Sequence, residues 1–247
     1  MKKFLLLLFC CVLPLSAKII VAAASSMQNA LKESASVFTK ETGTAVEAVY
    51  GSSGKLTAQI KNGAPFDVFM SADMAFPESL AVAKLTEGKP AVYARGTLVL
   101  WTIKNIDVSN CRQALMDSAY AKIAVADPLT APYGKATIAF LRNENIFNAI
   151  EKKLVYGDNV SQTAQYIMSG AVDMGITAKS LTKTPEAAGK GHWVELQCAK
   201  YPPVDHGIAL LRYGMENNPE AAKAFIRFIL SDTGRKLLEK CGFTGVN

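Results

Sequence analysis

The sequence predicts an α/β protein of two lobes, each with a mainly parallel sheet flanked by helices. First, short apolar runs that suit buried strands alternate with segments whose apolar residues recur at helical spacing. This alternation is typical of parallel α/β sheets. Second, serine- or glycine-containing junctions repeatedly connect such a strand to such a helix. Third, a length of 247 residues is enough for two small lobes.

The segment 18–38 sets the pattern for the rest of the chain. Residues 19–21 are Ile-Ile-Val, a run that suits a strand buried on both faces. Positions 27, 31, 35 and 38 then form one apolar helical stripe. Ser25 and Ser26 stand at the junction, where the free amides of the first helical turn and the positive end of the helix dipole face outward. Ser25 is therefore either a simple helix cap or part of an anion site.

Further elements follow from the same patterns. We expect strands over the apolar runs 45–50, 66–72, 96–103, 123–126, 172–177, 193–196 and 207–211. We expect helices over 55–63, 77–84, 110–116, 134–142, 145–154, 160–170, 219–229 and 231–238. Three later junctions repeat the first one: the Gly-Ser-Ser sequence at 51–53, the loop 127–134, and Asn159, which precedes the helix that begins at Val160.

The order of these elements predicts how the chain divides. Residues 18–95 and 206–247 would form the first lobe, and residues 96–205 the second. The stretches 93–96 and 201–205 would connect the two. Paired crossings of this kind indicate a hinged clamp.

The N-terminus carries the features of a signal peptide over residues 1–17. Two lysines, an apolar run at 4–13 and small residues at 15–17 predict cleavage after Ala17 and secretion to the periplasm. The apolar run is too short for a membrane span. Loss of the two lysines lowers the formal net charge from +6 to +4. Because the remaining basic residues are scattered, nucleic acid is not an expected partner.

The potential metal and redox residues are sparse. Cys111, Cys198 and Cys241 remain after cleavage, and one disulfide is possible, but the sequence does not choose the pair. His192 and His206 lie apart without partners at ligand spacing, so we expect them at the surface or in the hinge. A metal site formed by side chains is not expected.

One short motif favours an enzyme. The sequence Ser52-Ser53-Gly54-Lys55 matches the S-x-x-K pattern of serine–lysine acyl enzymes, with Ser52 as the nucleophile and Lys55 as its base. The pattern is common by chance, and the accompanying S-D-N and K-T-G motifs are missing.

The junctions also carry a family resemblance. Ala-Ala-Ala-Ser at 22–25 and Gly-Ser-Ser at 51–53 form two serine loops, 64–73 reads Ala-Pro-Phe-Asp-Val-Phe-Met-Ser-Ala-Asp, and 127–134 fits D-P-x-x-x-P-x-G. In this order, with 159–160, 175–176, 201–202 and 241–243, they resemble the periplasmic molybdate-binding proteins of ABC importers over nearly the whole mature chain.

This resemblance implies a type II periplasmic binding protein that holds an oxyanion between its lobes. It implies that the hydroxyls and amides of Ser25 and Ser53 bind the anion, together with the amides of Tyr133 and Val160. The amide of Ser26 is a further candidate.

One position departs from the family. Many relatives carry a tyrosine where this chain has Ala178, so the role of Ala178 in binding is less certain. Either the Tyr133 hydroxyl replaces the missing donor from across the cleft, or the ring packs as a lid and water fills the space beside Ala178.

The implied donors are uncharged, and they restrict the ligand. A pocket that only donates hydrogen bonds disfavours monohydrogen phosphate, whose proton needs an acceptor. Sulfate and molybdate share charge and shape, so only pocket size separates them.

The resemblance thus implies a receptor rather than an enzyme. It would act as a monomer that captures molybdate or tungstate and delivers it to the permease of an ABC importer. No cofactor is expected, and molybdenum would be bound only as its oxyanion, without a protein ligand to the metal. The alternatives are a receptor for sulfate or another tetrahedral oxyanion and, more remotely, a secreted serine acyl-transfer enzyme.

Overall fold

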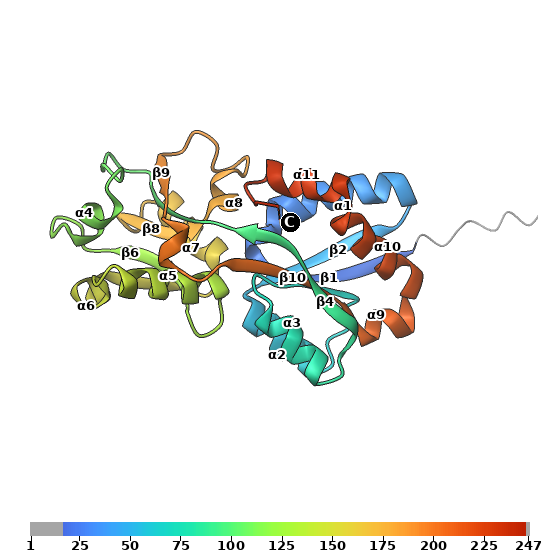
Figure 1. Cartoon of the computed structure of the whole chain (residues 1–247). Coiled ribbons are helices and arrows are strands. Elements are labelled where there is room, and N and C mark those ends of the chain that lie inside the picture. Colours follow the sequence, from blue (N-terminus) through green and yellow to red (C-terminus); the bar gives the residue numbers. More distant parts are fainter. Residues whose placement is uncertain (1–16, 246–247) are drawn as a thin grey trace, which may run out of the picture.

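The protein contains two five-stranded sheets with helices packed against them (Figure 1). A computed structural model describes residues 17–245. The strands are β1 (Lys18–Ala24), β2 (Ala45–Gly51), β3 (Val68–Met70), β4 (Thr86–Gly96), β5 (Leu98–Thr102), β6 (Ile123–Ala126), β7 (Leu154–Gly157), β8 (Met174–Ala178), β9 (His192–Glu195) and β10 (Val204–Leu211). The helices are α1 (Gln28–Thr42), α2 (Ser53–Lys61), α3 (Ala75–Val82), α4 (Cys111–Met116), α5 (Pro132–Asn143), α6 (Phe147–Ile150), α7 (Val160–Met168), α8 (Lys179–Thr182), α9 (Arg212–Asn217), α10 (Pro219–Leu230) and α11 (Asp232–Lys240). Three short 3-10 turns are η1 (Ser25–Met27), η2 (Glu151–Lys153) and η3 (Cys198–Lys200).

Both sheets have the same topology. The strand order is β2-β1-β3-β10-β4 in the first sheet and β7-β6-β8-β5-β9 in the second. In each sheet three strands pair in parallel, a fourth pairs antiparallel with one of them, and a fifth pairs antiparallel with the fourth. The predicted α/β architecture is confirmed: four strands of each sheet run in one direction and one runs against them, so the sheets are mixed. The reason is that β5 and β10 each arrive from the other sheet and enter against the direction of the parallel strands.

Two neighbouring strands connect the sheets. β4 leads out of the first sheet and β10 returns to it, and the two strands run side by side between the halves of the molecule (Figure 1). They pair antiparallel with Asp205 opposite Arg95, and an ion pair of 2.5 Å joins Arg95 Nε to Asp205 Oδ1. The stretches 93–96 and 201–205, expected as crossings, lie at this connection.

Each sheet has its own apolar core. The first sheet packs on one face against α1, α10 and α11, where Phe38 and Phe225 are buried. Its other face packs against α2 and α3 through Leu56 and Leu80. The second sheet surrounds the fully buried Trp101 with its own helices. The two sheets are joined by two strands, so a site between them lies where residues of both sheets meet.

Four elements differ from the sequence-based expectation. Apart from Gly96, β4 was not predicted as a strand, because its first half is polar and contains Pro90. Proline is tolerated here because β4 is an edge strand whose pairing with β10 is irregular. The expected helix over 145–154 stops after α6 and η2, because the chain from Leu154 pairs with β6 as strand β7. Helices α8 and α9 were also missed.

The sequence also led to expectations about a signal peptide, a membrane span, a metal site and the cysteines. The signal peptide predicted over 1–17 lies outside the described residues apart from Ala17. No helix in the described part of the chain has the length and apolarity that a membrane crossing needs. Between residues 17 and 245, no cluster of His, Cys, Asp or Glu is fit to hold a metal ion. The three cysteines at 111, 198 and 241 are free thiols.

Candidate functional site

A small cavity lies between the two sheets, at the ends of β1 and β2 and at the starts of η1, α2, α5 and α7. Its lining residues are Ala24, Ser25, Ser26, Gly51, Ser52, Ser53, Ala72, Ala131, Pro132, Tyr133, Asn159 and Val160. Five of the six residues that the sequence singles out are therefore together. The sixth, Ala178, ends β8 as a fully buried residue and does not line this cavity.

The first serine loop is held from both sides. Ser25 and Ser26 follow β1 directly and begin η1, which continues into α1. The Ser25 carbonyl accepts a hydrogen bond from Ser161 Oγ (3.1 Å), and the Ser26 carbonyl accepts one from Ser180 Oγ (2.8 Å). These two hydrogen bonds hold the loop in place. Its amides belong to the first helical turn and therefore have no acceptor within the helix.

The Ser26 side chain forms a hydrogen bond with His206. His206 Nδ1 lies 3.1 Å from the Val204 carbonyl, which only accepts hydrogen bonds, so Nδ1 carries the proton. Burial lowers the pKa of His206 to about 4, so the ring is neutral at pH 7 and Nε2 is an acceptor. The Ser26 hydroxyl, 3.2 Å away, therefore donates to His206. This leaves the amide of Ser26 as its available donor, as expected from the sequence. His206 is not at the surface but fully buried beside the crossing.

The second serine loop offers a hydroxyl with a free proton. Ser53 begins α2, and its Oγ accepts a hydrogen bond of 3.0 Å from the Ala72 amide. Because the oxygen accepts, the hydroxyl proton of Ser53 remains free to donate. The neighbouring Gly54 amide donates to the Thr130 carbonyl (2.9 Å), which draws this loop against the chain that precedes α5.

Two helices of the second half complete the donor set. Pro132 and Tyr133 open α5, with proline at a first-turn position where no amide is needed. Asn159 caps α7 by accepting from the amides of Ser161 (3.0 Å) and Gln162 (3.1 Å). The amides of Tyr133 and Val160 belong to first turns and have no acceptor within their own helices.

The electrostatics of the cavity come from dipoles rather than charges. All twelve lining residues are uncharged. Four helical N-termini nevertheless point their partial positive charge at one place, which favours an anion. The arrangement can bind a compact oxyanion through neutral donors.

Comparison with known proteins agrees with this geometry. Residues 19–244 match the sequence model of the bacterial extracellular solute-binding proteins. The chain belongs to this family. Among its relatives, the molybdate-binding protein ModA of Rhodobacter capsulatus is 32% identical over 227 residues, covering 92% of this chain and 88% of the relative. ModA of Azotobacter vinelandii is also 32% identical, over 230 residues, covering 92% and 90%.

A solved structure is similar over the same length. The periplasmic molybdate-binding protein of Azotobacter vinelandii superimposes with a TM-score of 0.87 at 28% identity, covering 93% of this chain and all of that one. The expected type II periplasmic binding protein fold is thereby confirmed for this solute-binding protein.

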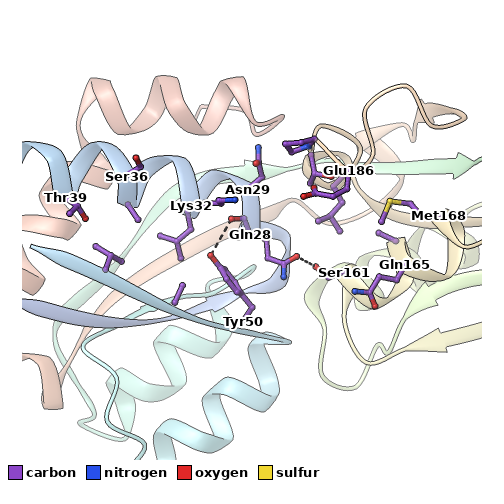
Figure 2. A pocket seen from close by; sticks show the side chains of 18 residues that line it. Gln28, Asn29, Lys32, Ser36, Thr39, Tyr50, Ser161, Gln165, Met168 and Glu186 are labelled. Atoms are coloured by element: carbon purple, nitrogen blue, oxygen red, sulfur yellow. Dashed lines mark hydrogen bonds between the residues drawn. The ribbon is translucent and has the colours of Figure 1, made fainter.

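A wider groove of about 850 Å³ lies beside the small cavity in this solute-binding protein. Its lining comes from α1 and β2 on one side and from α7 and α8 on the other (Figure 2). Gln28 spans it: its carbonyl accepts from Tyr50 Oη (3.4 Å) and its Oε1 from Ser161 Oγ (2.9 Å). Lys32 and Glu186 also line the groove, so it lacks the convergence of uncharged donors found in the small cavity.

The serine–lysine motif does not form a catalytic pair. Lys55 Nζ makes an ion pair of 2.8 Å with Asp158 instead. Ser52 Oγ has no hydrogen-bond partner. A nucleophile needs its base within hydrogen-bond reach, so the geometry gives no support to an acyl-transfer enzyme.

Sequence interpretation missed three residues that shape the site. Ser161 and Ser180 hold the first serine loop from the other half of the protein, and His206 takes the Ser26 hydroxyl. Serines near helix starts carry no signal for such distant contacts. A lone histidine next to an expected crossing was the one available clue.

Proposed function

We propose that this solute-binding protein captures molybdate in the cavity between its two sheets and delivers it to an ABC importer. The observation that carries the proposal is the convergence of five sequence-predicted donor residues on one uncharged cavity. Relatives and a solved structure named for molybdate binding share the family and the fold. We infer that the protein is a receptor and not an enzyme, acts as a monomer in the periplasm after loss of residues 1–17, and also accepts tungstate.

The proposed ligand contacts follow the sequence prediction. Ser25 and Ser53 would bind through hydroxyl and amide, and Ser26, Tyr133 and Val160 through their amides. A hydrogen bond to a charged group contributes roughly 1.5–3 kcal/mol, so several together can support tight binding without a counter-charge. What supports the set is that these residues share one cavity, whereas Ala178 is not part of it.

The proposed division of labour places the hinge between the sheets. Residues 18–95 with 206–247 would form one lobe and 96–205 the other, so that ligand bridges donors from both. The turn η1 and helix α2 would supply one side of the donor set, and α5 and α7 the other.

A thermal-shift titration of the mature protein with molybdate, tungstate, sulfate and phosphate tests the proposal. A ligand that binds only the native state raises the melting temperature, and at a given ligand concentration the rise is larger the tighter the ligand binds. We expect molybdate and tungstate to raise it strongly, sulfate weakly and phosphate not at all. A sulfate shift equal to that of molybdate would favour a general oxyanion receptor instead.

A further inference from the structure

Two residues that line the candidate cavity carry a hydroxyl without a hydrogen-bond partner. Among residues 17–245, the buried side-chain oxygens without a hydrogen-bond partner belong to Ser34, Ser52, Tyr93, Thr130, Tyr133 and Thr137. Of these residues, Ser52 and Tyr133 are in the cavity lining. A buried hydroxyl without a partner is unfavourable, and such groups in native proteins need an explanation. A ligand in the cavity would provide one.

Ser52 occupies a position where its hydroxyl would ordinarily cap a helix. It is the N-cap residue of α2, with φ −71° and ψ 145°, and it is 3% exposed. An N-cap serine normally accepts a hydrogen bond from an amide of the first turn. The Ser52 side chain makes no such bond, although its carbonyl accepts from the Leu56 amide (3.0 Å) as a cap residue should. The backbone thus performs the cap role while the hydroxyl stays uncommitted.

The other hydroxyls near the cavity have different surroundings. The Ser53 oxygen already accepts from the Ala72 amide. The Tyr133 hydroxyl lies against Gly96 at the end of β4. The contact is so close that a Cβ atom added at Gly96 would fall 1.9 Å from this hydroxyl. Gly96 does not line the cavity. Ser52 is therefore the lining residue whose hydroxyl is both unpartnered and free of the crossing.

We propose that the Ser52 hydroxyl donates a hydrogen bond to the bound oxyanion, next to the donors of Ser53. The inference rests on the proposed function and extends its ligand set by one residue. A hydrogen bond from a hydroxyl to an anion is stronger than one between neutral groups. Binding would then satisfy an oxygen that the ligand-free fold leaves without a partner.

The test compares two serine-to-alanine variants by calorimetric titration with molybdate. Ser52→Ala removes the proposed donor. Ser34→Ala is a matched control, since Ser34 is also a fully buried serine without a partner but lies within α1, away from the cavity lining. We expect Ser52→Ala to weaken molybdate binding by roughly tenfold and Ser34→Ala to change it by less than twofold.

Melting temperatures without ligand separate a donor from a packing role. Both variants delete an unpaired hydroxyl, so neither should melt below the parent. A loss of affinity in Ser52→Ala together with a lower ligand-free melting temperature would assign packing to Ser52 and overturn the proposal. Unchanged affinity in Ser52→Ala would also overturn it. If the parent itself does not bind molybdate, the proposed function fails, and that result is distinct from either outcome.

A second variant guards against misfolding of the first. Ser52→Cys keeps nearly the same shape and replaces the hydroxyl with a weak donor. It should bind molybdate more weakly than the parent while retaining the parent's melting temperature. Parent-like affinity in this variant would count against the hydroxyl as a ligand donor.

Discussion

At the scale of single residues, the Ser53 hydroxyl has one partner in the fold and a proton left for a second. Its oxygen accepts from the buried Ala72 amide, and its proton is free for the ligand. The neighbouring Ser52 hydroxyl has no such structural contact. Removal of the Ser53 hydroxyl should therefore lower the folding stability, whereas removal of the Ser52 hydroxyl should not.

Replacing Ser53 with alanine should weaken both binding and folding. The ligand loses a hydroxyl donor, and the buried Ala72 amide loses its acceptor, each at about 1–3 kcal/mol. Calorimetry with molybdate and chemical unfolding without ligand measure the two effects. A Ser53→Ala protein with parental stability would contradict the role of the Ala72 contact, and one with parental affinity would reduce Ser53 to a cap.

Tyr133 tests the two roles that the sequence left open. Its ring is fully buried, lies edge-on to His206 with centroids 5.7 Å apart, and makes no hydrogen bond within 3.5 Å, although the Ser26 hydroxyl is close enough to affect its pKa. Burial raises that pKa well above its ordinary value, so the hydroxyl stays protonated.

Removing only the Tyr133 hydroxyl should leave binding intact. The hydroxyl lies against Gly96, so we expect the amide to be the contribution of this residue to the ligand. Tyr133→Phe should bind molybdate within twofold of the parent by calorimetry, with equal or higher stability because a buried unpaired oxygen is gone. A tenfold loss would instead identify the hydroxyl as a replacement for the donor missing at Ala178.

At the scale of elements, β10 is tied to the first serine loop by one histidine. His206 accepts from Ser26 and donates to the Val204 carbonyl. The rings of Tyr93, Tyr133 and Phe243 lie edge-on around it. Burial in this environment explains the lowered pKa of His206, which the hydrogen bond to the Val204 carbonyl and the charge of Asp205 partly oppose.

The histidine should make folding stability depend on pH. Its pKa falls from 6.5 to about 4 on folding, so between these values the unfolded chain binds a proton that the native protein does not. Stability is therefore full above pH 6.5, falls by about 1.4 kcal/mol per pH unit as the pH drops toward 4, and levels off below. Urea unfolding of the parent and of His206→Gln, which cannot titrate, measures this contribution. Equal slopes for both proteins would contradict it.

Element boundaries show where long-range pairing overrides local sequence. The polar, proline-containing start of β4 and the chain from Leu154 carry no strong strand pattern, yet both form strands at sheet edges. Pairing with β10 and β6 supplies the hydrogen bonds that the local sequence does not predict.

At the scale of the whole molecule, contacts between the two halves surround the cavity. Gly54 bonds to the Thr130 carbonyl and Lys55 pairs with Asp158, while Ser180 reaches the Ser26 carbonyl. The ion pair is solvent-exposed and contributes at most about 1 kcal/mol. In this structure the two halves are thus closed around the cavity, with hydrogen bonds between them.

A single methyl group at the crossing should oppose this closed arrangement. A Cβ atom at Gly96 would lie 1.9 Å from Tyr133 Oη and 2.9 Å from His206 Cε1, which belong to opposite halves. Gly96→Ala should therefore weaken molybdate binding at least tenfold without touching the ligand. Small-angle scattering should show that molybdate shrinks the radius of gyration of the parent but not of this variant. Equal affinity and equal contraction in both would show that the crossing tolerates the methyl group.

The sequence by itself determined the elements that rely on local periodicity. The apolar run 19–21, the stripe that continues into α1, and the caps at Asn159 and Ser231 follow from side-chain spacing and short-range hydrogen bonds. The same patterns placed serines at two helix starts and so indicated an anion site. Its five central residues were named from the order of these junctions and the family they resemble.

Only the tertiary structure decided how these residues are used. Ser26 and His206 are 180 positions apart, and Ser180 and the Ser26 carbonyl are 154 apart. Whether a hydroxyl forms a hydrogen bond with such a distant residue or stays free for a ligand depends on which elements pack together. That packing is set by the burial of two whole sheets, which no short stretch of sequence encodes.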